Sequence, residues 1–212
     1  MTRKPLIGLL LSATALLPLS AANAITFGLG TELGFAMPTS DFPSDLKSQE
    51  GLNIRTTNGN PGTSFTPGVF VLFGGFELGM RFHNFSSTLT STDTNLNGDD
   101  FDGKVKTFDL AFRVYPLDLP VASVWVSAGA GYSRVDFGDV GGGVQPGLHL
   151  FPSVGAEFTL FPMVKAGPLL RYNYVVAATP NNIDYGGGNL SVDDVSSNLS
   201  WFDIQASVRV GF

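Results

Sequence analysis

Residues 201–212, at the end of the chain, alternate strictly between apolar and polar side chains. The even positions from Phe202 to Phe212 are apolar, whereas the odd positions, among them Asp203 and Arg209, are polar, small or polar-tipped. Because successive side chains of a β-strand point to opposite faces, this pattern predicts one strand with an apolar face and a polar face. Its length matches the roughly 9–11 residues that a tilted strand needs to cross a bilayer.

Seven further segments are predicted to be strands, and most of them repeat this alternation. In residues 104–115, for example, Leu110 belongs to the apolar face and Asp109 to the polar one. The alternation is poor in residues 65–73, because residues 69–73 are all apolar. The eight predicted strands are residues 25–35, 65–73, 76–88, 104–115, 121–137, 148–160, 164–177 and 201–212.

Long and short connections alternate between these segments. Eight antiparallel strands joined in this way would place four long loops at one end of the sheet, and three short turns with both termini at the other end. The long polar segments are residues 37–64, 91–103, 138–147 and 179–198, and the short turns are Gly74-Gly75, residues 116–120 and residues 161–163.

An eight-stranded barrel can be soluble or can span a membrane, and the two differ in which face is apolar. A soluble barrel of the lipocalin kind would bury its apolar set inside, but the glycine-rich polar set of this chain could not then fill a core. The smaller, more polar set suits a narrow interior, and the larger apolar set suits hydrocarbon. Since a bilayer offers no partners to open strand edges, we predict an all-β fold: an eight-stranded antiparallel up-and-down transmembrane β-barrel.

The terminal Phe212, preceded by apolar residues at alternate positions, resembles the closing strand of bacterial outer-membrane β-barrels. The alternation of short turns and long loops over the whole chain resembles the small OmpA/OmpX-type barrels of that class. This resemblance implies a monomer in the outer membrane with periplasmic termini. It implies that Phe212 is part of the signal read by the barrel assembly machinery, and that lipid and lipopolysaccharide surround the barrel. It identifies a class and not a particular function.

Residues 1–24 have the pattern of a secretory signal peptide. Two basic residues precede an apolar run over residues 6–19, and the Ala-Asn-Ala segment that ends at Ala24 is a small-x-small cleavage site. We expect the mature chain to begin at Ile25 and the barrel domain to cover residues 25–212. A membrane anchor is the alternative, but the apolar run is shorter than the ~20 residues of a spanning helix.

Composition excludes several classes of function. The chain has no cysteine, which excludes disulfides, thiolate metal sites and thiol nucleophiles. Its formal net charge is −6 and its pI is about 4.7, so a nucleic-acid partner, which requires clustered basic residues, is not expected.

Eight charged residues are predicted to face the interior at two heights. Each height would hold two acids and two bases, and we name this set the lumen charge network. A single antiparallel register of residues 76–88 and 104–115 would place an acid directly opposite a base at two positions. Those pairs are Glu77 with Arg113 and Arg81 with Asp109. The lower level comprises Glu77, Arg113, Glu157 and Arg209, and the level near mid-height comprises Glu32, Arg81, Asp109 and Arg171.

The lumen charge network has a structural interpretation and a functional one. The interior of an eight-stranded barrel is just wide enough for side chains to fill, which favours paired charges that close the lumen. A pathway or gate for protons or ions is the alternative. We expect removal of Arg81 alone to destabilise the barrel, because Asp109 stays buried, and exchange of the charges of Arg81 and Asp109 to restore much of that loss.

No catalytic motif is complete in this chain. Outer-membrane lipid hydrolases carry a His-x-Ser pair, but neither His83 nor His149 is followed by that serine. We interpret His83 as an interior polar residue and His149 as a residue at the rim. The carboxylate pairs Asp99-Asp100 and Asp193-Asp194 resemble those of omptin proteases, but those enzymes have ten strands and longer chains. We therefore assign no catalytic site and no cofactor.

The segment from Asp93 to Asp99 has oxygen ligands and a glycine at the spacing of the first part of an EF-hand loop. Lys104 stands where that loop needs a bidentate glutamate, and the flanking segments are predicted strands. A polar hairpin tip with an Asn-Gly turn explains the same residues. No metal site is assigned.

We therefore predict a non-enzymatic outer-membrane barrel with a structural or surface-interaction role, in which four long acidic loops form the contact surface. A narrow channel for ions or small solutes is one alternative. A lipid-modifying enzyme without a recognisable motif is another.

Overall fold

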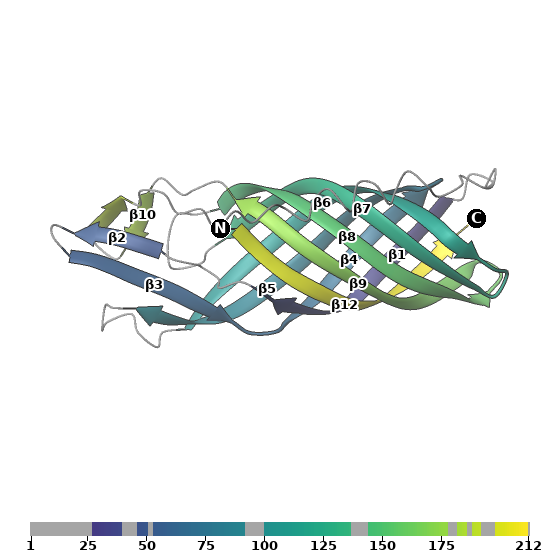
Figure 1. Cartoon of the computed structure of the whole chain (residues 1–212), viewed down its shortest axis with the longest axis horizontal. Helices are drawn as coiled ribbons and strands as arrows, with labels where there is room; N and C mark the ends of the chain where they lie inside the picture. Colours follow the sequence, from purple (N-terminus) through teal and green to yellow (C-terminus); the bar gives the residue numbers. More distant parts are fainter. Residues whose placement is uncertain are drawn as a thin grey trace, which may run out of the picture.

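The computed structural model is a closed barrel of eight antiparallel strands with a strand extension at one end (Figure 1). The structure describes residues 27–39, 46–50, 53–91, 100–136, 144–177, 182–185, 188–191 and 198–211. The predicted signal peptide, Ile25, Phe212 and the segment from Asp93 to Asp99 lie outside these residues. No helix in the described ranges has the length and apolar character needed to cross a membrane.

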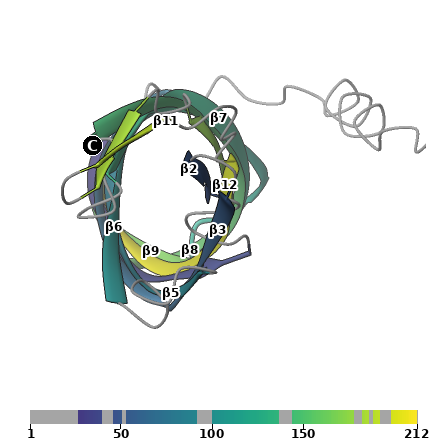
Figure 2. The same ribbon diagram turned by 90° about the vertical axis from the view of Figure 1, so that its left-hand side faces the viewer.

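Eight long strands follow one another around the barrel, and Figure 2 shows them end-on as a ring. They agree with the eight segments that the alternation predicts, although most are longer. In spatial order they are β1 (Phe27–Pro38), β4 (Ser64–Phe73), β5 (Phe76–Ser91), β6 (Asp100–Asp118), β7 (Ala122–Asp136), β8 (Val144–Phe161), β9 (Val164–Ala177) and β12 (Asn198–Gly211).

The barrel closes between its first and last strands. β1 pairs with β12 from Gly28 opposite Gly211 onward, and on its other side it pairs with β4. β5 then pairs with β6, which completes the ring. Because no strand of the ring has an unpaired edge, its backbone polar groups can be satisfied without water.

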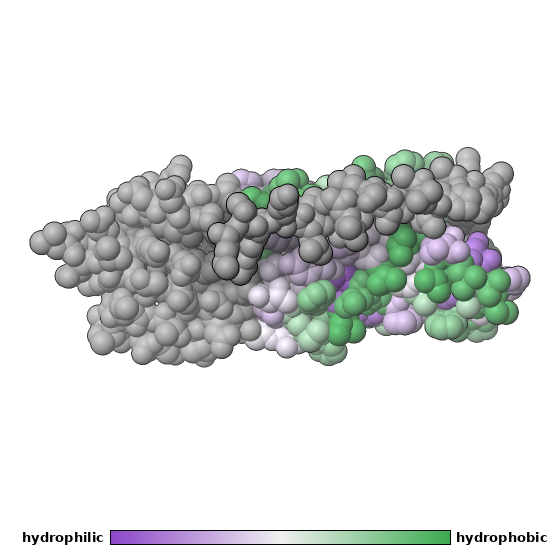
Figure 3. All heavy atoms as spheres, in the orientation of Figure 1, coloured by the Kyte–Doolittle hydropathy of each residue, from purple (hydrophilic) through white to green (hydrophobic). Residues whose placement is uncertain are grey.

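Period-two alternation places the apolar set outside and the polar set inside. The outward Leu29, Leu78 and Leu110 expose 58%, 63% and 56% of their surface, whereas Arg81 and Glu32 are fully buried in the interior. Figure 3 shows apolar side chains gathered on the face of the barrel that it draws. Such an outer surface suits an apolar surrounding, because a water-soluble barrel would direct its large apolar side chains inward.

β4 alternates regularly, although its sequence does not show it. The side chains of Phe65, Val69 and Phe73 are exposed, while Phe70 and Leu72 are each 2% exposed and point into the lumen. The apolar residues at 69–73 therefore point alternately to the outer surface and to the lumen. The poor alternation of apolar and polar residues in this part of the sequence does not interrupt the strand.

The segment predicted as a long loop, residues 37–64, contains two further strands. β2 (Leu46–Glu50) and β3 (Asn53–Pro61) form a hairpin, and β3 pairs with the end of β5 from Pro61 opposite Ser87 to Thr57 opposite Ser91. This pairing prolongs the sheet beyond the ring (Figure 1). β10 (Asn182–Tyr185) and β11 (Gly188–Ser191) form a separate hairpin within the fourth predicted loop.

The three short turns lie together at the opposite end. Gly74 has a φ of 59°, in the left-handed region that glycine adopts without strain, and it joins β4 to β5. β8 and β9 are joined at residues 162–163, as predicted. The turn predicted at residues 116–120 begins later than expected, because β6 continues through a bulge between Val114 and Leu117 as far as Asp118.

Candidate functional site: the lumen charge network

The lower level of the lumen, toward the short turns, is a chain of ion pairs across four strands. Arg113 of β6 binds Glu77 of β5 and reaches past β7 to Glu157 of β8, with 2.9 Å between Nη1 and Oε1. Arg209 of β12 binds the other oxygen of Glu157 at 2.7 Å. The four residues predicted for this level are therefore joined to one another through buried contacts.

The middle level is centred on Arg81 and Glu32. Arg81 Nε lies 2.7 Å from Glu32 Oε2, and its Nη1 lies 2.8 Å from Asp109 Oδ2. Arg171 approaches Glu32 from β9 at 3.0 Å, so Glu32 lies between two guanidinium groups. Arg81 Nη2 also binds Glu77 at 2.6 Å, and this contact links the middle level to the lower one.

A third level lies above these two, toward the loops. His149 Nδ1 is 2.5 Å from Asp109 Oδ1, and His149 Nε2 is 3.0 Å from Asn173 Oδ1. Asn173 donates from Nδ2 to Asp203 at 2.9 Å, and His83 Nε2 lies 3.3 Å from both oxygens of Asp203. These contacts extend the hydrogen-bonded set across the lumen from β6 to β5.

Aromatic rings fill the space between the charged levels. The Arg113 guanidinium lies 3.8 Å from the centroid of Trp125, and Phe151 faces the guanidinium groups of Arg81 and Arg171 at 5.5 and 5.1 Å. His149 stacks on Trp201 with a 2° angle between the rings. The attraction between a cation and a ring face stabilises guanidinium groups that water does not reach.

The predicted register of β5 and β6 is wrong by two residues. Glu77 faces Ala111 and Arg81 faces Thr107, although both predicted ion pairs are present. The pairs are diagonal contacts, which long side chains can make across an antiparallel sheet. Gly79 stands opposite Asp109, and a Cβ on Gly79 would lie 2.5 Å from Arg81 Nη1, so the missing side chain leaves room for the guanidinium.

His149 is not a rim residue. Its side chain is fully buried inside the lumen, between Asp109 and Asn173. His149 points inward because side chains alternate along β8, and His149 lies an even number of residues from the inward Ser153 and Glu157. His83 is interior and fully buried, as predicted.

Sequence reasoning missed three residues that complete the network. Asp203 and Asn173 occupy inward positions of predicted strands, and Gln205 accepts from Arg171 Nη1 at 3.2 Å. Asp203 also lies 3.9 Å from Arg171. The sequence does indicate that Asp203 faces the interior, since it occupies an odd, polar position of the last strand. It was not assigned to the network because the two predicted levels each already contained two acids and two bases.

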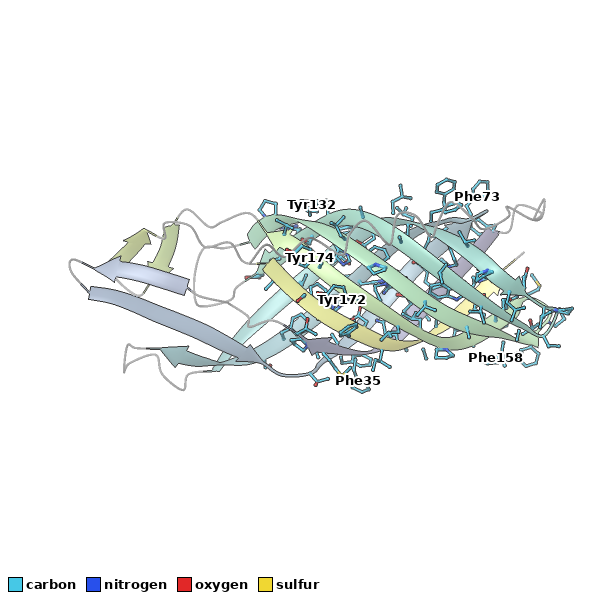
Figure 4. All side chains as sticks on the ribbon, viewed as in Figure 1. Phe35, Phe73, Tyr132, Phe158, Tyr172 and Tyr174 are labelled. Atoms are coloured by element: carbon cyan, nitrogen blue, oxygen red, sulfur yellow. The ribbon has the colours of Figure 1, made fainter. Side chains whose placement is uncertain are left out.

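The outer surface carries aromatic residues toward both ends of the barrel. Figure 4 shows Tyr132, Tyr172 and Tyr174 toward the end that bears the loops, and Phe73 and Phe158 toward the end that bears the short turns. Tyrosine, with an apolar ring and a polar tip, is typical of the level at which a membrane meets water. The belt between the two groups is the apolar surface described above.

Some buried polar atoms of the described interior have no hydrogen-bond partner in the protein. They include His83 Nδ1, Thr66 Oγ1, Ser133 Oγ and Arg171 Nε. Within the described residues, no group of three or more histidine, cysteine, aspartate or glutamate side chains is placed to hold a metal ion. The geometry of the described residues offers paired charges and hydrogen bonds, among them the bond from Thr107 Oγ1 to Asp109 Oδ2 at 2.9 Å.

A closed eight-stranded barrel with an apolar outer belt and a charged interior has the architecture of the small bacterial outer-membrane β-barrels. Solved structures of that class superpose on the chain. OprG from Pseudomonas aeruginosa matches with a TM-score of 0.54 at 14% identity, covering 88% of this chain and 96% of its own. AlkL matches with a TM-score of 0.52 at 12% identity, covering 100% and 97%.

Neisserial surface protein A gives a similar result, with a TM-score of 0.51 at 15% identity over 88% of this chain and 97% of its own. No family model matches the sequence. No curated protein matches it either. At these identities the likeness shows the fold, and the predicted class of barrel is confirmed at that level.

Proposed function

We propose that this protein is a non-enzymatic integral barrel of the bacterial outer membrane, closed to solutes, whose loops form a contact surface for an extracellular ligand. Outer-membrane lipid and lipopolysaccharide would surround the apolar belt, and the barrel assembly machinery would insert the chain as a monomer. The resemblance of the fold to OprG, AlkL and Neisserial surface protein A supports the location.

The observation that carries the closed state is the continuity of the lumen charge network. Glu77 is held by Arg81 and Arg113, so the lower and middle levels form one connected set of buried ion pairs. Trp125, Phe151 and Trp201, all at most 2% exposed, pack among them. A solute would have to separate several buried charge pairs to pass, and a buried charge left without any partner costs about 3–5 kcal/mol.

Conductance of the purified barrel in planar bilayers tests this proposal. We expect no stable, defined conductance from the wild-type protein. A reproducible single-channel level would contradict the closed state and support the channel. One observation favours the channel. Interior atoms such as His83 Nδ1 and Ser133 Oγ have no hydrogen-bond partner in the protein, and water in the lumen could form those bonds.

The absence of enzymatic activity is likewise part of the proposal. The two buried imidazoles, His83 and His149, bind carboxylate and amide groups, which supports a structural role for both. Mass spectrometry of lipid A from cells with and without the protein provides the test. Loss or gain of an acyl chain that depends on the protein would contradict a non-enzymatic role.

A further inference from the structure

Two cations face each other on the outside of the barrel. Lys106 of β6 stands directly opposite Arg134 of β7, and both side chains are exposed. Their neighbours of inward parity, Val105 and Val135, are fully buried, which fixes the direction of the pair. Like charges that face each other across two strands are destabilising, so this arrangement needs an explanation.

Neither cation has an acidic partner among the described residues. Lys106 Nζ lies 5.9 Å from the ring centroid of Phe82, and this is a contact with a ring, not with a carboxylate. The four arginines of the lumen, by contrast, each bind at least one carboxylate. Lys104 is also exposed and outward, and it stands opposite Asp136, so the local excess of positive charge lies at Lys106 and Arg134.

The pair lies at a defined height on the outer surface. Phe108 and Tyr132 are the next outward residues toward the short turns. They stand opposite each other and are 47% and 49% exposed. Tyr132 belongs to the tyrosines that lie toward the loop end (Figure 4). Lys106 and Arg134 come two residues nearer the loops, about 7 Å further along their strands. If the tyrosines mark the interface of the membrane, the two cations lie at the level of the lipid headgroups.

We infer that Lys106 and Arg134 form a binding site for a phosphate group of a phosphorylated glycolipid of the outer leaflet, the lipid A part of lipopolysaccharide. Directly opposite Cβ atoms are about 5 Å apart, so both side chains can reach one phosphate. Arginine supplies two parallel donors and lysine supplies a point charge. The acyl chains below the phosphate would lie on Phe108 and Tyr132. This inference rests on the outer-membrane location in the proposed function.

The binding test uses the intact mature barrel in mild detergent and native mass spectrometry. Its probes are lipid A carrying both phosphates, the same lipid dephosphorylated, phosphatidylglycerol and inorganic phosphate. We expect the phosphorylated lipid A to bind most tightly, and K106Q or R134Q to weaken that binding about tenfold, which corresponds to loss of one charge-assisted contact. Lys165→Gln is the matched control, because Lys165 lies near the short turns and binds Ser123.

Each outcome supports or overturns the site. Selective loss in K106Q and R134Q, with K165Q unchanged, supports it. Equal binding of dephosphorylated lipid A, or an equal loss in K165Q, overturns the phosphate site. Phosphatidylglycerol binding as tightly as lipid A overturns the glycolipid assignment, and inorganic phosphate binding as tightly as lipid A overturns the lipid source. Conductance does not enter this test, so its failure and the failure of the closed-barrel proposal are distinguishable.

A second measurement keeps the inference testable if binding in detergent is weak. Without an anionic lipid, K106Q removes a like-charge repulsion, so its unfolding midpoint in urea from zwitterionic vesicles should equal or exceed that of the wild type. With phosphorylated lipid A in the same vesicles, the order should reverse. An order that is the same in both kinds of vesicle overturns the site.

Discussion

Arg81 binds three carboxylates at once, from Glu32, Glu77 and Asp109. The contact with Asp109 is therefore not an isolated ion pair. A reversed pair, with aspartate at 81 and arginine at 109, would place the new carboxylate beside Glu32 and Glu77. The rescue that an isolated pair would allow is therefore not expected, and Arg81 is better described as the centre of a group than as half of a pair.

Replacement of Arg81 should cost more stability than replacement of Arg209. Arg81→Met leaves three buried carboxylates short of a partner, and we expect a loss of about 3–5 kcal/mol. Arg209 binds one acid among the described residues, Glu157, which keeps its contact with Arg113. We expect Arg209→Met to cost about 1–3 kcal/mol. Urea unfolding from lipid vesicles measures both.

The order of the two losses is the decisive result, because both variants remove one buried guanidinium. Equal losses would mean that the number of carboxylate partners does not matter, and that the lumen is wet enough to screen its charges. A larger loss in Arg209→Met would contradict the central place of Arg81 in the network.

At the scale of the strands, alternation predicted the barrel because lipid and lumen demand opposite side chains from neighbouring residues. The alternation is hidden in the sequence of β4, a strand that was nevertheless predicted, because Phe70 and Leu72 point into the lumen and Phe70 faces the Arg113 guanidinium at 5.4 Å. An apolar residue can satisfy either face, so its parity cannot be seen in the sequence. The hairpin of β2 and β3 was missed because residues 46–61 are mostly polar, so their sequence shows no apolar face.

The register of β5 and β6 shows a second limit. Arg81 and Asp109 can meet directly or diagonally, because an arginine side chain spans more than one residue along the neighbouring strand. Charge pairing is compatible with registers two residues apart, and both keep every side chain on its own face. The identity of the paired residues was therefore predictable from the sequence, whereas their alignment was not.

The facing of β6 can be tested by two adjacent substitutions. Leu110 is 56% exposed on the outer belt and Ala111 is 3% exposed in the lumen. Leu110→Arg should destabilise the barrel by roughly 2–4 kcal/mol if it lies near the midplane of the bilayer, because the cation would enter hydrocarbon. Ala111→Ser should be nearly neutral, since it adds a hydroxyl on the polar side. Urea unfolding from vesicles in which the two effects are reversed would contradict this facing.

At the scale of the whole molecule, assembly is a separate requirement from stability. The closing pair of β1 and β12 runs to Gly28 opposite Gly211, so the sheet is closed before Phe212 is reached. Deletion of Phe212 should therefore change the urea midpoint of refolded protein little. If Phe212 is read by the assembly machinery, the same deletion should lower the amount of protein in the outer membrane of cells. Normal amounts in fractionated cells would contradict that role.

The two ends of the barrel differ, and the difference predicts its orientation. Phe27 and Gly211 lie at the end with the short turns, while the extension of β3 and β5 lies at the other (Figure 1). Long connections of outer-membrane barrels face the outside and short turns face the periplasm. An epitope inserted within residues 92–99 should accordingly bind antibody on intact cells. The same epitope between Gly74 and Gly75 should bind only after the outer membrane is permeabilised. Labelling of the Gly74 insertion on intact cells, at equal protein levels, would reverse the orientation and would place Lys106 and Arg134 in the inner leaflet.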